Sequence, residues 1–184
     1  SFDKFRPAFV SITYGALGNA RGGTVELSTK IKKDYSLETL THLTAAGKSR
    51  QELENILIGA RYAGIENILA LRGDAPAGKS FTKHKQGHRY AYQLVEQMAA
   101  MNQGKYLQGE GECTNFNIGV ACYPEGHKDN PRKHKEAEYL KIKQDAGADF
   151  AITQMTFNNQ AYFRFVEEAR SLGVTITIIP GVMP

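Results

Sequence analysis

Cysteines and long apolar runs are scarce in this sequence of 184 residues. Its two cysteines, Cys113 and Cys122, are too few for a disulfide scaffold, and their spacing is not that of a metal site. No run approaches the ~18 apolar residues that span a membrane. Residues 1–7 lack the apolar segment of a signal peptide. We therefore expect a cytoplasmic protein without a membrane partner.

Motifs of several common enzyme classes are also missing. The sequence contains no Gly-x-Ser-x-Gly elbow, no P-loop and no Gly-x-Gly-x-x-Gly after a predicted strand. No predicted strand ends in the lysine that a Schiff-base aldolase requires. His84 and His88 have helical i, i+4 spacing, but no carboxylate completes a metal site. We expect no metal, and any dinucleotide must bind in a way other than the Rossmann fashion.

Basic residues outnumber acidic ones, giving a net charge of +4. Much of the excess lies in two segments, residues 79–89 and 127–135. Such segments have three interpretations: they could bind a nucleic acid, bind a phosphate-bearing small molecule, or form a solvated basic face. The apolar content of 41% and charged content of 23% are those of an ordinary folded domain.

Strand and helix patterns alternate along the whole chain, without an evident domain boundary. Ser49 and Glu52 form a capping-box motif that opens one of the helices. Residues 102–115 are expected to be irregular. The predicted strands cover residues 8–14, 40–44, 67–71, 116–123, 149–154 and 175–180, and the helices cover 24–33, 50–63, 87–101, 132–146 and 159–172.

This alternation predicts an α/β fold with a parallel sheet and right-handed crossovers. The sheet could be open and doubly wound, or it could be part of an eight-stranded barrel. In a barrel every strand tip faces one bowl, whereas in an open sheet only the strands near the switch point do. Polar or special residues at all six tips favour the barrel: Thr13-Tyr14, His42 with Thr44, Arg72-Gly73-Asp74, Tyr123, Gln154 and Pro180-Gly181.

The strand at residues 67–71 shows this pattern most clearly, because an apolar run ends abruptly in Arg72, Gly73 and Asp74. A rigid strand that delivers charged groups at its C-terminal tip is typical of β/α enzymes. The tips together offer aromatic rings, amides, hydroxyls and charges. This set suits a flat polar heterocycle and a pyrophosphate better than it suits hydrolysis.

Six sequence blocks in order resemble the methylenetetrahydrofolate reductase family, and they extend over nearly the whole chain. They are Phe9-Val10-Ser11-Ile12-Thr13-Tyr14-Gly15-Ala16, Thr41-His42-Leu43-Thr44, Leu71-Arg72-Gly73-Asp74, Tyr123-Pro124-Glu125-Gly126-His127, Ala146-Gly147-Ala148-Asp149 with Ile152-Thr153-Gln154, and Ile179-Pro180-Gly181-Val182-Met183-Pro184.

The resemblance implies a (βα)8 TIM barrel, with about six of its eight strands in this chain. It also implies FAD-dependent reduction of 5,10-methylenetetrahydrofolate to 5-methyltetrahydrofolate, a step that feeds methionine synthesis. NADH or NADPH would donate the hydride in a ping-pong cycle through the flavin. The expected partners are these small molecules and further copies of the protein in a homo-oligomer, not a nucleic acid.

The family also implies roles for individual residues. Asp74 would orient the folate and stabilise its cationic form, and it would also contact the flavin. Gln154 would bind the substrate. On composition alone, Lys143 on its Lys-rich helix would be solvated. The implied cofactor-binding residues are Thr13, Tyr14, Ala16, His42, Arg72, Gly73, Asp74, Tyr90, Ala91, Tyr123, His127 and Lys143.

The chain departs from the family pattern at Glu136, Tyr139 and Ile142, where Asp, Asn and Arg are common. The departures predict fewer polar contacts to the adenosine-diphosphate half of FAD. The family's general-acid glutamate lies on a first strand that does not match this chain. We therefore expect residues 1–184 to be one catalytic-barrel segment that lacks the first and last strands. A degenerate, non-catalytic relative that keeps the binding tips is the alternative.

Overall fold

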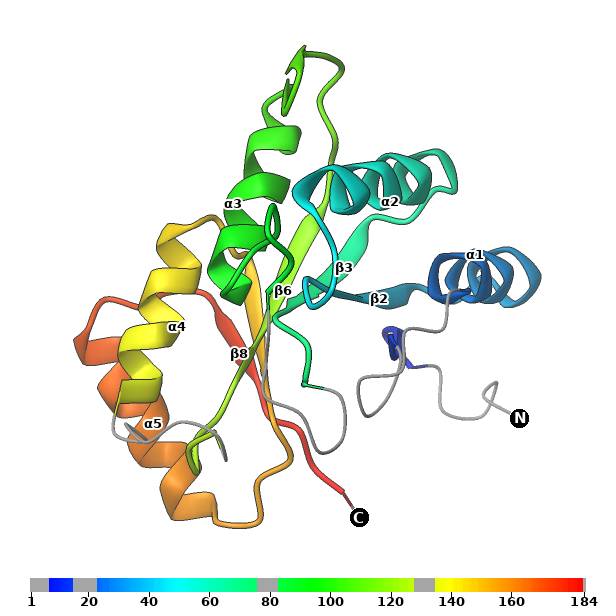
Figure 1. Cartoon of the computed structure of the whole chain (residues 1–184). Helices are drawn as coiled ribbons and strands as arrows, with labels where there is room; N and C mark the ends of the chain where they lie inside the picture. Colours follow the sequence, from blue (N-terminus) through cyan, green and yellow to red (C-terminus); the bar gives the residue numbers. More distant parts are fainter. Residues whose placement is uncertain (1–6, 15–22, 76–82, 128–134, 184) are drawn as a thin grey trace.

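The computed structural model describes residues 7–14, 23–75, 83–127 and 135–183. Six parallel strands form one curved sheet with helices along its outer side (Figure 1). The strands are β1 (Val10–Ile12), β2 (Thr39–Thr44), β3 (Asn67–Leu71), β6 (Asn117–Cys122), β7 (Phe150–Thr153) and β8 (Thr177–Ile179). The helices are α1 (Thr24–Tyr35), α2 (Arg50–Tyr62), α3 (Ala91–Asn102), α4 (Glu136–Asp145) and α5 (Asn159–Ser171).

The order of the strands decides between the two predicted closures. Neighbours in the sheet follow the order of the chain, β1, β2, β3, β6, β7 and β8, and every pairing is parallel. A doubly wound sheet reverses its order at a switch point, whereas a barrel does not. The chain therefore has the α/β fold of a partial TIM barrel, as predicted.

Alternation along β3 shows how each strand serves two sides of the sheet. Ile68 and Ala70 are buried in the main core, beneath the helices. Leu69 and Leu71 point to the other side, where they line a cavity. Because successive side chains of a strand point to opposite faces, one strand supplies both the core and the concave face.

The core between sheet and helices is built from aliphatic side chains of both layers. Leu53 and Leu57 of α2 lie on one helical face, four residues apart, and are fully buried. Ser49 opens α2 with the predicted capping box, since its hydroxyl accepts from Glu52 N at 3.1 Å and its own N–H donates to the Glu52 carboxylate at 2.7 Å. Gly64, at φ 74°, follows the end of the same helix.

Two predicted segments differ from the structure. Helix α3 begins at Ala91 and not at residue 87, because the Gln93 side chain accepts from Arg89 N and Tyr90 N. Residues 102–115 are not irregular throughout: β4 (Lys105–Tyr106) and β5 (Gly109–Glu110) form an antiparallel hairpin. This hairpin lies beyond the C-terminal end of α3, at the top of Figure 1.

The two outer strands, β1 and β8, each pair on one side only among the described residues. Within the same residues, no helix is long and apolar enough to cross a membrane. The Cys113 and Cys122 thiols are both free, the first exposed and the second buried.

Candidate active site

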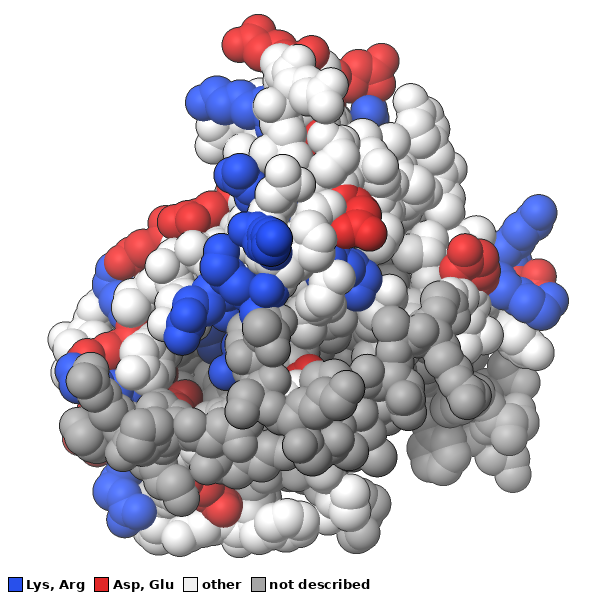
Figure 2. Space-filling model, viewed as in Figure 1, with Lys and Arg blue, Asp and Glu red and all other residues white. Residues whose placement is uncertain are grey.

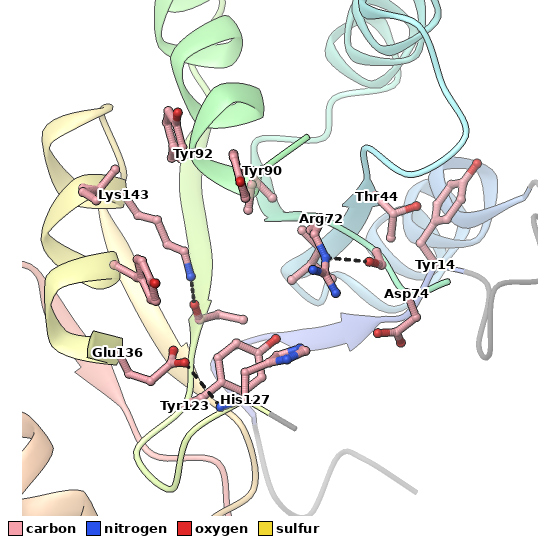
Figure 3. Close-up of a pocket in the computed structure, with 17 residues that line it drawn as sticks. Tyr14, Thr44, Arg72, Asp74, Tyr90, Tyr92, Tyr123, His127, Glu136 and Lys143 are labelled. Atoms are coloured by element: carbon pink, nitrogen blue, oxygen red, sulfur yellow. Dashed lines mark hydrogen bonds between the residues drawn. The ribbon is translucent and has the colours of Figure 1, made fainter. Parts of the chain in front are cut away.

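A cavity of about 480 Å³ opens between the C-terminal ends of β3 and β6 and the helices α3 and α4. In Figure 3, Lys143 and Glu136 reach into it from the α4 side, and Arg72 and Asp74 lie across from them. We call it the outer cavity. Its lining is Tyr14, Thr44, Ala70, Leu71, Arg72, Gly73, Asp74, Tyr90, Ala91, Tyr92, Ala121, Tyr123, His127, Glu136, Tyr139, Ile142 and Lys143.

A second cavity of about 580 Å³ lies on the concave face of the sheet, and we call it the inner cavity. Side chains from β1, β2, β3 and the tip of β7 line it. Its lining is Ser11, His42, Leu69, Leu71, Asp74, Ala121, Tyr123, Pro124, Glu125, Gly126, His127, Ile152, Thr153, Gln154 and Met155.

The two cavities share the residues at the tips of β3 and β6. Leu71, Asp74, Ala121, Tyr123 and His127 line both of them. A ligand bound in one cavity would therefore face a ligand bound in the other across Asp74 and Tyr123. Two adjacent sites with a common charged wall suit a reaction in which a cofactor and a substrate meet.

Most of the residues predicted for the site lie in these cavities. Nine line the outer cavity, and His42 and Gln154 line the inner one. Thr13 lines neither cavity. Its carbonyl accepts a hydrogen bond from Thr24 Oγ1 at 3.4 Å. Ala16 lies outside the described residues. The nine are Tyr14, Arg72, Gly73, Asp74, Tyr90, Ala91, Tyr123, His127 and Lys143.

Lys143 brings a half-buried cation to the outer cavity. Its Nζ donates to the Ala121 carbonyl at 2.6 Å, and it is within ion-pair distance of no carboxylate among the described residues. Burial lowers the pKa of this ammonium. A positive charge held in this way is suited to an anionic ligand.

Tyr123 and His127 form the wall that the two cavities share. Their rings meet edge to face at 4.6 Å between centroids, and His127 N donates to Glu136 Oε1 at 3.3 Å. Burial, and then the nearby Asp74 carboxylate, raise the pKa of Tyr123 to about 12. Its phenol is therefore protonated at neutral pH and can donate a hydrogen bond.

His42 presents a neutral imidazole to the inner cavity. Burial lowers its pKa to about 4, so the ring carries no charge at neutral pH. Its Nε2 lies 2.7 Å from Ser11 Oγ on the neighbouring strand. A neutral imidazole is a suitable neighbour for an uncharged heterocycle.

The tip of β3 turns sharply between the two cavities. Gly73 has φ 84°, and a Cβ at this position would lie 2.8 Å from Ala46 Cβ and 3.0 Å from Thr44 Cβ. A larger residue would therefore be strained and crowded. Arg72 Nε donates to the Gly73 carbonyl at 3.3 Å. Only glycine lets the strand deliver Arg72 and Asp74 to adjacent positions on the cavity wall.

Two elements supply residues that sequence reasoning did not place in the site. Tyr92, in the first turn of α3, lines the outer cavity with its ring stacked on that of Tyr90 at 5.8 Å. Ser11 lines the inner cavity beside His42. Ser11 lies between the apolar residues Val10 and Ile12 on β1, and this alternation was the signal that could have found it.

Basic side chains gather near the end of α3 that lines the outer cavity (Figure 2). Figure 2 shows Lys and Arg gathered over the N-terminal end of α3 and acidic side chains over the β4–β5 hairpin. Lys83, Lys85 and Arg89, all exposed, precede α3 directly. Such a distribution attracts anionic small molecules to the cavity.

The comparison with protein families matches residues 2–184 to the family described as methylenetetrahydrofolate reductase. The chain belongs to this family. Relatives in the family include methylenetetrahydrofolate reductase 1 of Schizosaccharomyces pombe, 36% identical over 97% of this chain, and 5,10-methylenetetrahydrofolate reductase of Salmonella typhimurium, 37% identical over 97% of this chain.

The chain spans only part of these relatives, 28% of the yeast reductase and 55% of the bacterial one. Among solved structures, a 2,3-dimethylmalate lyase of the PEP mutase/isocitrate lyase superfamily matches with a TM-score of 0.58 at 10% identity. The match covers 94% of this chain and 68% of the lyase chain. At such low identity it supports the fold alone.

Proposed function

We propose that the chain is the flavin-binding part of a reductase that converts 5,10-methylenetetrahydrofolate to 5-methyltetrahydrofolate with NADH or NADPH. The observation that carries this proposal is the pair of cavities that meet at Asp74 and Tyr123. A cofactor in the outer cavity would present one ring to whichever substrate occupies the inner cavity. Alternating occupation of the inner cavity by the nicotinamide and the folate corresponds to a ping-pong cycle.

The outer cavity fits a flavin dinucleotide in the chemistry of its walls. Lys143 offers a cation without a carboxylate partner among the described residues, as a pyrophosphate requires. Tyr90, Tyr92 and Tyr139 offer flat aromatic surfaces. Tyr139 and Ile142 supply no charged contact, so burial of rings and not hydrogen bonding is expected to hold the outer half of FAD. When bound, the flavin supplies the hydride chemistry.

The residues of the chain position the substrates and stabilise charge. The Asp74 carboxylate, in the wall between the cavities, would favour the cationic iminium form of the folate's methylene group. Gln154 would orient the substrate through its amide. The neutral His42 and the protonated Tyr123 would offer hydrogen bonds to uncharged heterocycles.

We propose further that the chain is one segment of a longer catalytic barrel. The two outer strands of the described sheet each pair on one side only, and the relatives are roughly two to four times as long. Strands elsewhere in the protein would complete the barrel and supply the general acid. A cytoplasmic homo-oligomer with a role in methionine synthesis completes the proposal.

The test is direct. The full-length protein should bind FAD, absorb in the visible range, and oxidise NADH or NADPH with menadione or methylenetetrahydrofolate as acceptor. A full-length protein that remains colourless in the presence of FAD and oxidises neither nicotinamide would disprove the proposal. FAD binding without any turnover would favour the alternative, a non-catalytic relative.

A further inference from the structure

Glu125 ties together two loops at the rim of the inner cavity. It follows β6, in the loop that leads toward α4. Its Oε1 accepts hydrogen bonds from Thr156 Oγ1 at 2.6 Å, Phe157 N at 2.9 Å and Asn158 N at 3.0 Å. All three donors lie between β7 and α5. One carboxylate oxygen therefore holds the loop that carries Gln154 into the cavity.

The same loop is fixed on its other side by the end of β8. Thr156 N donates to the Gly181 carbonyl at 3.2 Å, and Gly181 N donates to Thr153 Oγ1 at 2.8 Å. Gln154 N continues the β6 ladder by donating to the Cys122 carbonyl at 2.8 Å. Residues 154–156 thus run between two strand ends, and Glu125 supplies the side-chain contacts that fix where the segment turns.

Glu125 is suited to hold a loop because it acts only as an acceptor. The hydrogen bond from the Thr156 hydroxyl, followed by those from the Asn158 and Phe157 amides, holds the pKa of this carboxyl below its usual value. The group is therefore ionised at neutral pH. It also lies just before the N-terminus of α5, where the helix dipole favours a negative charge.

The Gln154 side chain bonds to the backbone of the same segment. Gln154 Oε1 accepts from the next backbone amide, Met155 N, at 3.1 Å. Any rotation of the Met155 peptide would therefore move the Gln154 amide as well. Glu125 holds residues 156–158, which follow that peptide directly.

We propose that Glu125 is a positioning residue for folate binding, which holds the Gln154 amide in place by fixing residues 156–158. This inference rests on the proposed function. A residue that only stabilised the fold would change the binding of every ligand, or of none. A residue that positions Gln154 should affect the folate, which would bind in the inner cavity, and not FAD, which would bind in the outer one.

The experiment uses the full-length protein and the variants Glu125→Ala, Glu125→Gln and Thr156→Val. Glu125→Ala should raise the KM for methylenetetrahydrofolate on the order of five- to tenfold, because all three hydrogen bonds are lost. Glu125→Gln should have an intermediate effect, because its amide oxygen still accepts. The effects of Glu125→Ala and Thr156→Val should not add in the double variant. FAD affinity should stay within about twofold of wild type, because FAD would occupy the outer cavity, which Glu125 does not line.

Glu167→Ala provides the matched control, because Glu167 is an exposed carboxylate further along α5. An equal folate KM for Glu125→Ala and Glu167→Ala would overturn the proposal. So would a loss of FAD affinity as large as the loss of folate affinity.

Hydrogen exchange of residues 155–158 separates this inference from the proposed function. Exchange there should accelerate in Glu125→Ala and not in Glu167→Ala, even in a protein without activity. Unchanged exchange would show that Glu125 does not hold the loop. A wild-type protein with neither flavin nor turnover would instead overturn the proposed function.

Discussion

The two ends of the six-stranded sheet are both rich in polar residues, but these residues have different partners. At the end where the strands begin, side chains bond to one another. Asn117 Nδ2 donates to Asn67 Oδ1 at 3.0 Å, Asn67 Nδ2 donates to Glu38 at 3.2 Å, and Asn115 donates to Glu66 at 2.8 Å. At the end where the strands stop, Asp74, Gln154 and Lys143 instead line cavities.

This difference separates polar groups that serve the fold from polar groups that serve a ligand. Burial of paired polar groups costs little free energy when the chain folds, because each group replaces a hydrogen bond to water with one to a protein partner. A half-buried ammonium such as Lys143, which pairs with no carboxylate among the described residues, is destabilising until an anion binds. Substitutions at the first end should therefore change stability, and substitutions at the second should change binding and turnover.

Asp74→Asn tests the ligand end and should have the largest effect. It removes the negative charge but keeps the shape, so folate reduction should fall about 100-fold through loss of electrostatic stabilisation. FAD affinity, measured by fluorescence titration, should change by less than about threefold, because Lys143 and the aromatic walls remain.

Asp34→Asn is the control for this substitution, since Asp34 pairs with Lys30 on the outer surface of α1. It should leave both quantities unchanged. If Asp74→Asn reduced FAD affinity and folate reduction by the same factor, Asp74 would serve the cofactor and not the substrate.

Asn102→Ala tests the opposite end, where the effect should be on stability. Asn102 Oδ1 accepts from Thr114 Oγ1 at 2.6 Å and Phe116 N at 3.0 Å, and its Nδ2 donates to the Phe116 carbonyl at 2.9 Å. Loss of these hydrogen bonds should lower the free energy of unfolding, measured in urea, by about 2 kcal/mol. The kcat should stay within about twofold of wild type. Gln103→Ala, at the exposed neighbouring position, should be close to neutral. A loss of activity at unchanged stability would blur the distinction between the two ends.

The strand tips could be predicted from the sequence because they rest on local patterns. An apolar run followed by Arg72, Gly73 and Asp74 identifies a buried strand and its polar end, and Ser49 with Glu52 identifies a helix start. The alternation of strands and helices left two closures, and the polar tips favoured the barrel, whose strand order the sheet has. The lengths of the strands could not be predicted in the same way. Strand β1, for example, is limited to Val10–Ile12, the residues that pair with β2.

The remaining features depend on contacts between distant segments. The β4–β5 hairpin is held by Glu54 of α2, which accepts from Leu107 N at 2.8 Å, 53 positions away. Lys143 is half-buried although its helix is Lys-rich, because the carbonyl of Ala121 lies within reach. The sequence around Tyr92 and around Glu125 does not indicate that these residues lie at a cavity. Their positions depend on how distant segments pack around the two cavities.

His42 offers a smaller effect that depends on pH. Its folded pKa of about 4 lies below the ordinary value of 6.5, so between these values the unfolded chain binds a proton that the folded chain does not. Stability should therefore fall as the pH falls through this window. Between pH 7 and pH 4.5 the free energy of unfolding of the wild type, measured in urea, should fall by about 1–2 kcal/mol more than that of His42→Gln.

His88, whose pKa is also lowered by burial, contributes equally to both proteins and cancels in this difference. His84→Gln, in an exposed loop, should keep the wild-type dependence on pH. If His42→Gln and the wild type lost stability in parallel, the imidazole would not be held neutral in the inner cavity.

Lys143→Met should have the smallest effect and the most informative sign. The pKa of Lys143 is lowered from 10.5 by burial, so the charged form destabilises the folded apo-protein at neutral pH. Apo stability of the wild type should rise as the pH rises toward 10.5, because the unfolded chain then holds more protons than the folded chain. Lys143→Met should remove this rise, melt a few degrees higher at pH 7, and bind FAD about tenfold more weakly.

Lys141→Met, which breaks only the ion pair with Asp145, should show neither change. A Lys143→Met variant that lost apo stability and kept its FAD affinity would place Lys143 with the paired polar groups of the opposite end.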